Sequence, residues 1–140
     1  MKTLLQLIMV GILGLASVAH AGAPFCWSLS APGLGSSPTT LKLYASDMGG
    51  QLILSGTASY SLTTFPVTNI VLLVVGTAAL LNGNIEASLH AQGISPSPPN
   101  SFQTQGYYLT LNAATLNGSY IGHSPTVSSS SGTAGSVACN

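Results

Sequence analysis

The sequence predicts an all-β domain, an antiparallel up-and-down β-barrel, with a β-sandwich as the alternative. Apolar and polar residues alternate with a period of two in about seven or eight segments. Short turns containing Gly or Asn separate most of these segments, and no helical periodicity follows residue 21. A bond between Cys26 and Cys139 would tie the first strand to the last, and those strands are neighbours in a closed barrel. The cysteine positions therefore favour the barrel over the sandwich.

Residues 1–21 are predicted to be a secretory signal peptide. Lys2 supplies a positive start, residues 4–15 are almost wholly apolar, and small residues precede a cleavage site near Ala21. The apolar run is shorter than the roughly 20 residues of a membrane-spanning helix. We therefore expect a mature single domain, residues 22–140, that is secreted to the periplasm or the extracellular space.

The two cysteines are predicted to form a structural disulfide. Export places the chain in an oxidising compartment, and Cys26 and Cys139 allow only one pairing. A redox or metal-binding thiol would need a second Cys or a His nearby in the sequence, and neither cysteine has one. Closing so long a loop contributes about 4–5 kcal/mol on the chain-entropy model.

The first three predicted strands each place apolar residues on one face. A loop over residues 31–38 separates the first from the second, and the Gly49-Gly50 pair predicts a hairpin turn between the second and the third. The apolar face comprises Phe25, Trp27, Leu29, Leu41, Leu43, Ala45, Leu52, Leu54, Ala58 and Tyr60.

Residues 70–81 (IVLLVVGTAALL) are apolar on both faces. A membrane helix would need a longer run. A buried helix is disfavoured by the β-branched residues and by Gly76 in the middle of the run. We therefore expect a long strand covered on both faces, by another layer of the protein or by a partner subunit.

The remaining strands follow in short order. Asn82-Gly83 is the strongest short hairpin signal in the chain, and residues 85–92 alternate cleanly after it. Residues 94–101 contain prolines that cannot continue a ladder, so a loop is expected there. Further strands are expected at residues 107–112, 116–121 and 133–139, with a turn or bulge at Asn117-Gly118. Residues 128–135 (SSSSGTAG) are expected to be flexible or weakly paired.

The chain carries very few groups for catalysis or metal binding. Only 3% of its residues are charged, which excludes a nucleic-acid binder held by Lys and Arg contacts. There is no Gly-x-Ser-x-Gly motif and no phosphate-binding loop. Asp47 and Glu86 are the only carboxyl side chains, and His90 and His123 are too few for a stable metal site. We therefore expect no enzymatic activity, no cofactor and no metal.

The favoured function is a structural or interaction role at the cell surface or in the extracellular matrix. The partner would be another copy of the chain or another extracellular protein. Near-absence of charge and the two-sided apolar segment support this hypothesis, because charged side chains normally block association between sheets. The candidate interface residues are Val71, Leu73, Val75, Tyr44 and Tyr108.

The alternative function is a carrier for a small apolar ligand held in a barrel cavity. Its candidate pocket residues are the aromatic residues Trp27, Tyr60, Tyr107 and Tyr120. Insertion into a membrane is not expected, because eight spanning strands of about ten residues would use most of the chain. Asn117-Gly118-Ser119 matches the N-glycosylation pattern, and a turn explains Asn-Gly equally well.

Overall fold

The computed structural model describes residues 22–31, 38–49, 51–62, 68–95, 101–125 and 127–140. Most of these residues belong to eight β-strands. The strands are β1 (Phe25–Ser30), β2 (Thr39–Asp47), β3 (Leu52–Leu62), β4 (Thr68–Leu81), β5 (Asn84–Ser95), β6 (Ser101–Asn112), β7 (Gly118–Ser124) and β8 (Val127–Val137). The predicted signal peptide, residues 1–21, and most of the proline-containing loop lie outside the described residues.

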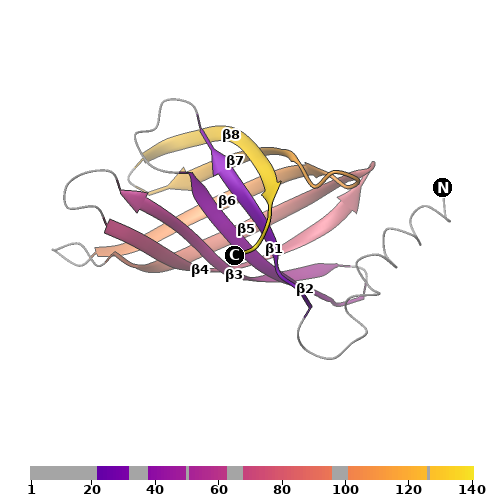
Figure 1. The fold of residues 1–140 in the computed structure, drawn as a ribbon, viewed down its shortest axis with the longest axis horizontal. Helices are drawn as coiled ribbons and strands as arrows, with labels where there is room; N and C mark the ends of the chain where they lie inside the picture. The colour runs from indigo at the N-terminus through magenta and orange to yellow at the C-terminus, as the bar shows by residue number, and fades with distance from the viewer. Residues whose placement is uncertain (1–21, 32–37, 50, 63–67, 96–100, 126) are drawn as a thin grey trace.

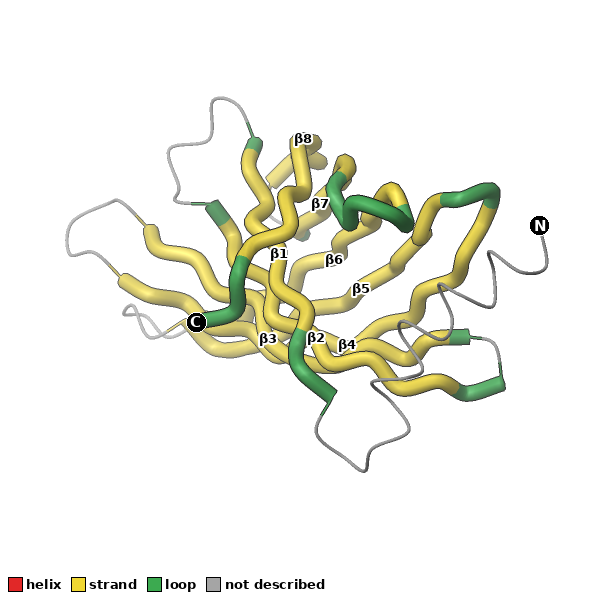
Figure 2. Tube along the Cα trace, turned by 45° about the vertical axis from the view of Figure 1, so that its right-hand side comes forward, coloured by secondary structure: helices red, strands yellow, loops and turns green. Residues whose placement is uncertain are grey.

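The strands form a closed barrel in which each strand pairs with its sequence neighbours (Figure 1). All pairings are antiparallel, and β1 also pairs with β8, which closes the sheet. Figure 2 shows the same strands winding around one interior, with loops at the two ends. The predicted up-and-down barrel is confirmed, and the sandwich alternative is wrong. Closure gives every strand two partners, so no sheet edge remains exposed.

The predicted disulfide is confirmed. Cys26 in β1 is bonded to Cys139, two residues after the end of β8, with a Cα–Cα distance of 5.4 Å. Figure 1 shows the C-terminal end of the chain lying beside β1. The bond reinforces the pairing of the first and last strands, and its presence is consistent with an extracellular location.

Alternation along each strand separates an apolar interior from a mainly Ser- and Thr-bearing exterior. Burying each large aliphatic side chain stabilises the fold by about 1.5–3 kcal/mol. The largest fully buried side chains are Leu29, Leu41, Leu43, Ile70, Leu72, Leu109 and Val74. The barrel core is therefore made of the residues that the period-two pattern placed on one face.

The turn between β4 and β5 forms as its residue types predict. Asn82 and Gly83 have φ angles of 52° and 81°. Positive φ at both central positions is typical of a two-residue turn whose twist matches the flanking strands. This turn sets the register in which Leu81 opposes Asn84.

The outer face of β4 corrects one expectation. Residues 70–81 do form a strand, and Ile70, Leu72 and Val74 are buried inside the barrel. On the other face, Val71, Leu73 and Val75 are 57%, 67% and 58% exposed. Since the barrel has a single layer, no described part of the chain covers this face. The expected second layer is therefore absent from the described residues, and cover by a partner subunit stays a prediction.

Residues 128–135 correct a second expectation, because they belong to strand β8, whose pairing with β7 has one irregularity between Gly122 and Ser124. The strand pairs with β7 on one side and β1 on the other, so backbone hydrogen bonding organises a segment with few apolar side chains. Gly132 is required at its position, since a Cβ there would collide with the carbonyl oxygen of Ser30. Among the described residues, no helix is long and apolar enough to cross a membrane.

Candidate functional site

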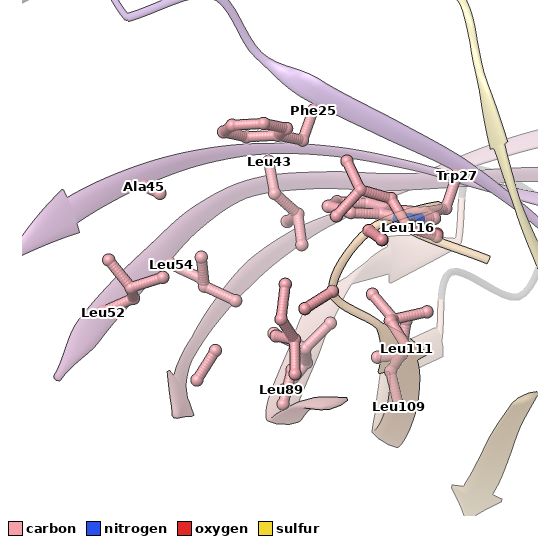
Figure 3. Close-up of a pocket in the computed structure, with 15 residues that line it drawn as sticks. Phe25, Trp27, Leu43, Ala45, Leu52, Leu54, Leu89, Leu109, Leu111 and Leu116 are labelled. Carbon is pink, nitrogen blue, oxygen red and sulfur yellow. Dashed lines mark hydrogen bonds between the residues drawn. The ribbon is translucent and has the colours of Figure 1, made fainter. Parts of the chain in front are cut away.

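One end of the barrel contains an apolar pocket of about 320 Å³. Its walls come from the inward positions of β1 to β6, and its mouth is bordered by the loop between β6 and β7. Figure 3 shows the labelled side chains pointing from these elements into one space. The lining residues are Phe25, Trp27, Leu43, Ala45, Leu52, Leu54, Ala78, Ile85, Ala87, Leu89, Leu109, Leu111, Ala113, Ala114 and Leu116.

The pocket exists because several inward positions carry alanine. Leu, Val and Ile fill the barrel deeper inside, whereas Ala45, Ala78 and Ala87 contribute only a methyl group each to the wall. Phe25 and Trp27 stack on one side, with ring centroids 6.1 Å apart. The volume lies within the range of small-molecule pockets, which is about 300–1,000 Å³.

The β6–β7 loop, residues 113–117, is held in place by its own hydrogen bonds. The Asn112 side-chain oxygen accepts from the backbone N–H groups of Ala114 and Thr115, at 2.9 and 3.1 Å. The backbone N–H of Leu116 donates to the Asn112 carbonyl at 2.8 Å, and Leu116 has a φ of 58°. These bonds form a compact turn, which is a common role of Asn.

Three further hydrogen bonds attach this loop to the barrel. The backbone N–H of Ala113 donates to the Gly83 carbonyl at 3.0 Å. The indole Nε1 of Trp27 donates to the Leu116 carbonyl at 2.8 Å. On the β8 side, the backbone N–H of Ser136 donates to the side-chain oxygen of Asn117 at 2.7 Å. The loop is thus anchored to three sides of the rim.

The pocket lining offers no free polar side-chain group. All fifteen residues are Ala, Leu, Ile, Phe or Trp, and the one polar atom among them, the Trp27 indole nitrogen, already donates to Leu116. A ligand inside the pocket would therefore be held by apolar contact alone. Polar atoms of such a ligand would need to stay at the mouth, where water can solvate them.

A polar network lies deeper in the barrel. Gln105 donates from Nε2 to the Tyr60 hydroxyl at 3.1 Å, and the Tyr107 hydroxyl donates to Oε1 of Gln105. Burial raises the pKa of both tyrosines, and for Tyr107 the nearby Tyr60 adds to the effect. Tyr107 is the next inward residue after the pocket residue Leu109 on β6. The network therefore fills the interior beyond the pocket.

The sequence-predicted pocket residues do not share one site: Tyr60 and Tyr107 belong to the polar network, and Tyr120 borders a second hollow. Trp27 lines the apolar pocket, whereas Tyr60, Tyr107 and Tyr120 do not. The aliphatic and alanine lining was not among the candidates, although the alternation had already placed most of it on the inward face. The second hollow, of about 720 Å³, borders three strands only and is lined mostly by Ser, Thr and Gly. Its residues are Ser30, Ala31, Ser119, Tyr120, Ile121, Ser131, Gly132 and Thr133.

The charged groups near the pocket mouth are few. Asp47 ends β2 and pairs in register with Leu52, a lining residue. By strand alternation it shares the inward side of Leu43 and Ala45. Lys42 lies on the alternate side of β2, and its Nζ donates to the main-chain oxygen of Asn140 at 3.3 Å. The rim thus carries a carboxylate and no inward-facing Lys or Arg in the described ranges.

The candidate interface residues all lie on the outside of the barrel. Val71, Leu73 and Val75 form a continuous row along β4. Tyr44 and Tyr108 are each 45% exposed. Tyr44 and Val75 flank Ser55 of β3 in register, so one strand separates them. Tyr108 lies on β6, on the other side of β4, and β5 separates these two strands.

The two histidines and Glu86 lie on the outer face of the barrel. His90 and His123 flank Gly106 on the outer face, opposite it in β5 and β7 respectively. Glu86 accepts a hydrogen bond from Thr110 at 2.8 Å, and its bond with Tyr108 raises the pKa of that tyrosine. Within these residues, no three His, Cys, Asp or Glu side chains gather where they could hold a metal ion.

No family model, no curated protein and no solved structure matches this chain.

Proposed function

We propose that this chain is a secreted, non-enzymatic β-barrel that binds a small apolar ligand. The observation that carries the proposal is the apolar pocket of about 320 Å³ at one end of the barrel. A core packed to ordinary protein density leaves few voids larger than a water molecule. A continuous space lined by fifteen apolar residues therefore supports a role in binding.

The distribution of side chains over the barrel supports a water-exposed protein. Serine and threonine occupy much of the outer face, while aliphatic side chains fill the interior. Secretion, with signal cleavage near Ala21, is part of the same proposal. The Cys26–Cys139 bond would stabilise the empty barrel in an oxidising compartment.

A neutral fluorescent dye such as N-phenyl-1-naphthylamine tests the proposal. We expect its fluorescence to rise on binding to the secreted protein, with one site per chain. Ala87→Leu places a larger side chain in the pocket wall and should abolish the signal, whereas Ser88→Leu adds the same side chain to the outer face and should preserve it. Equal binding by the two variants would place the dye elsewhere and contradict the proposal.

A second function, self-association through the outer face of β4, is favoured by the exposure of three neighbouring apolar side chains. Monomeric proteins rarely leave large contiguous apolar patches in water. Native mass spectrometry of the untagged protein distinguishes the two functions. A discrete multimer that Leu73→Asp converts to monomer would support association, and a monomer with extra mass that is lost on denaturation would support ligand binding.

A further inference from the structure

We infer that the pocket selects uncharged ligands and excludes carboxylates, including fatty acids, with Asp47 at the rim contributing to this selection. The inference rests on the proposed function, because it names the class of ligand for the same pocket. Its basis is the set of charges and hydrogen-bonding groups at the pocket and its mouth.

The lining supplies nothing to receive a carboxylate. An anion transferred from water into an apolar site loses far more solvation than an apolar group, unless cations or N–H donors replace the water. The only N–H donor among the lining side chains is that of Trp27, and the Leu116 carbonyl already accepts it. An alkyl chain or neutral ring meets no such penalty in this pocket.

The carboxylate of Asp47 at the rim would also repel an anionic head group. Asp47 is directly opposite the lining residue Leu52 and is exposed. A ligand whose chain fills the pocket would place its head group at this rim. Lys42 is the nearest lysine in sequence, but it belongs to the outer face and bonds to Asn140. A carboxylate head group at this rim would therefore lie near the carboxylate of Asp47.

Pocket size indicates the length of the ligand. A volume of 320 Å³ corresponds to about ten water-sized groups at roughly 30 Å³ each. A saturated chain of about ten carbons is a suitable probe, and it is available with either a neutral or an anionic head group. 1-Decanol and decanoate thus form a matched pair that differs mainly in charge.

The experiment measures displacement of the neutral dye by 1-decanol and by decanoate near neutral pH. We expect decanoate to bind at least about tenfold more weakly than 1-decanol. Asp47→Lys should strengthen decanoate binding by about threefold or more and leave 1-decanol unchanged. Glu86→Gln removes the other carboxylate, on the outer face of β5, and should change neither ligand.

Each failure has a separate meaning. Equal affinity for 1-decanol and decanoate would overturn the selection against carboxylates while leaving apolar binding intact. No effect of Asp47→Lys beyond that of Glu86→Gln would overturn the role of Asp47. Failure of the dye, 1-decanol and decanoate to bind at all would overturn the proposed function itself.

Discussion

Ala78 of β4 and Ala87 of β5 lie directly opposite each other in the antiparallel register, and both form part of the pocket wall. Each is only 3% exposed. Opposed side chains in a sheet are close enough to share one volume. This pair of methyl groups therefore leaves open a space that two larger side chains would fill.

Substituting leucine at these two positions should be strongly non-additive. Ala78→Leu alone places its side chain in the open pocket and should leave the free energy of unfolding within about 1 kcal/mol of the original. Ala78→Leu combined with Ala87→Leu directs two large side chains into one space, and we expect the pair to lose an additional ~1–3 kcal/mol through overpacking. Urea unfolding of the two single variants and the double variant measures the coupling.

The control for this series is Ala79→Leu, because Ala79 is on the opposite face of β4. It should combine additively with Ala87→Leu, since the two side chains then lie on different sides of the sheet. If the changes in the free energy of unfolding caused by Ala78→Leu and Ala87→Leu are also additive, the two leucine side chains do not share a volume.

Trp27→Phe tests how firmly the β6–β7 loop is attached to the rim. The phenyl ring keeps an apolar side chain in the pocket wall but removes the N–H that donates to Leu116. Loss of one hydrogen bond should cost about 0.5–1.5 kcal/mol of stability, with some further loss from the smaller ring. Amide hydrogen exchange at Leu116 and Asn117 should become faster than in Phe25→Leu, which removes the stacked neighbour but no hydrogen bond.

Much of the fold follows from local patterns in the sequence. Residues 85–92 alternate strictly, and the structure buries Ala87, Leu89 and Ala91 on the inward face. The Asn82-Gly83 pair adopts the positive φ angles that its residue types favour. In both places the local chemistry and the final fold agree, which is why the prediction was right.

The incorrect predictions concern segments whose structure depends on neighbouring strands or on a covering layer, which the pattern of residues within one segment does not specify. Residues 128–135 have few apolar side chains, so the sequence gives no burial signal; β7 and β1 order them through backbone pairing. The segment at residues 70–81 predicts a strand, but composition does not reveal whether another layer covers Val71, Leu73 and Val75. Burial of that face depends on tertiary or quaternary contacts.

The pocket is harder to predict than the strands, because it exists where small side chains leave part of the barrel interior unfilled. Aromatic residues were the natural candidates, since they are common in ligand sites. The space instead depends on small side chains such as Ala78 and Ala87, which are also ordinary core residues. Only the register of β4 and β5, which places Ala78 opposite Ala87, shows that these two small side chains leave one shared space open.

Removing the disulfide should weaken the barrel without changing its topology. In a variant carrying both Cys26→Ala and Cys139→Ala, we expect the free energy of unfolding to fall by about 4–5 kcal/mol. The unfolded chain regains the entropy lost when a loop spanning a sequence separation of 113 residues is closed. Urea unfolding of both proteins gives the difference, and unchanged stability would show that the bond does not constrain the unfolded chain.

Alkaline pH should destabilise the protein through the tyrosines beyond the pocket. Burial raises the pKa values of Tyr60 and Tyr107 above their ordinary value of 10.0. The unfolded chain therefore loses these protons at a lower pH than the folded barrel does. Their contribution is fully present below about pH 10 and is lost as the pH rises toward the folded-state pKa values.

Tyr107→Phe isolates the effect of the more strongly shifted tyrosine. It should cost about 0.5–1.5 kcal/mol at neutral pH, because Gln105 loses the hydroxyl donor to its Oε1. The decline of stability above about pH 10 should then be shallower than in the original protein, since one shifted group is gone. Tyr44→Phe, which removes a hydroxyl at an exposed position on β2, is the matched control. Urea unfolding across the alkaline range measures both slopes, and equal slopes for Tyr107→Phe and Tyr44→Phe would contradict the assignment.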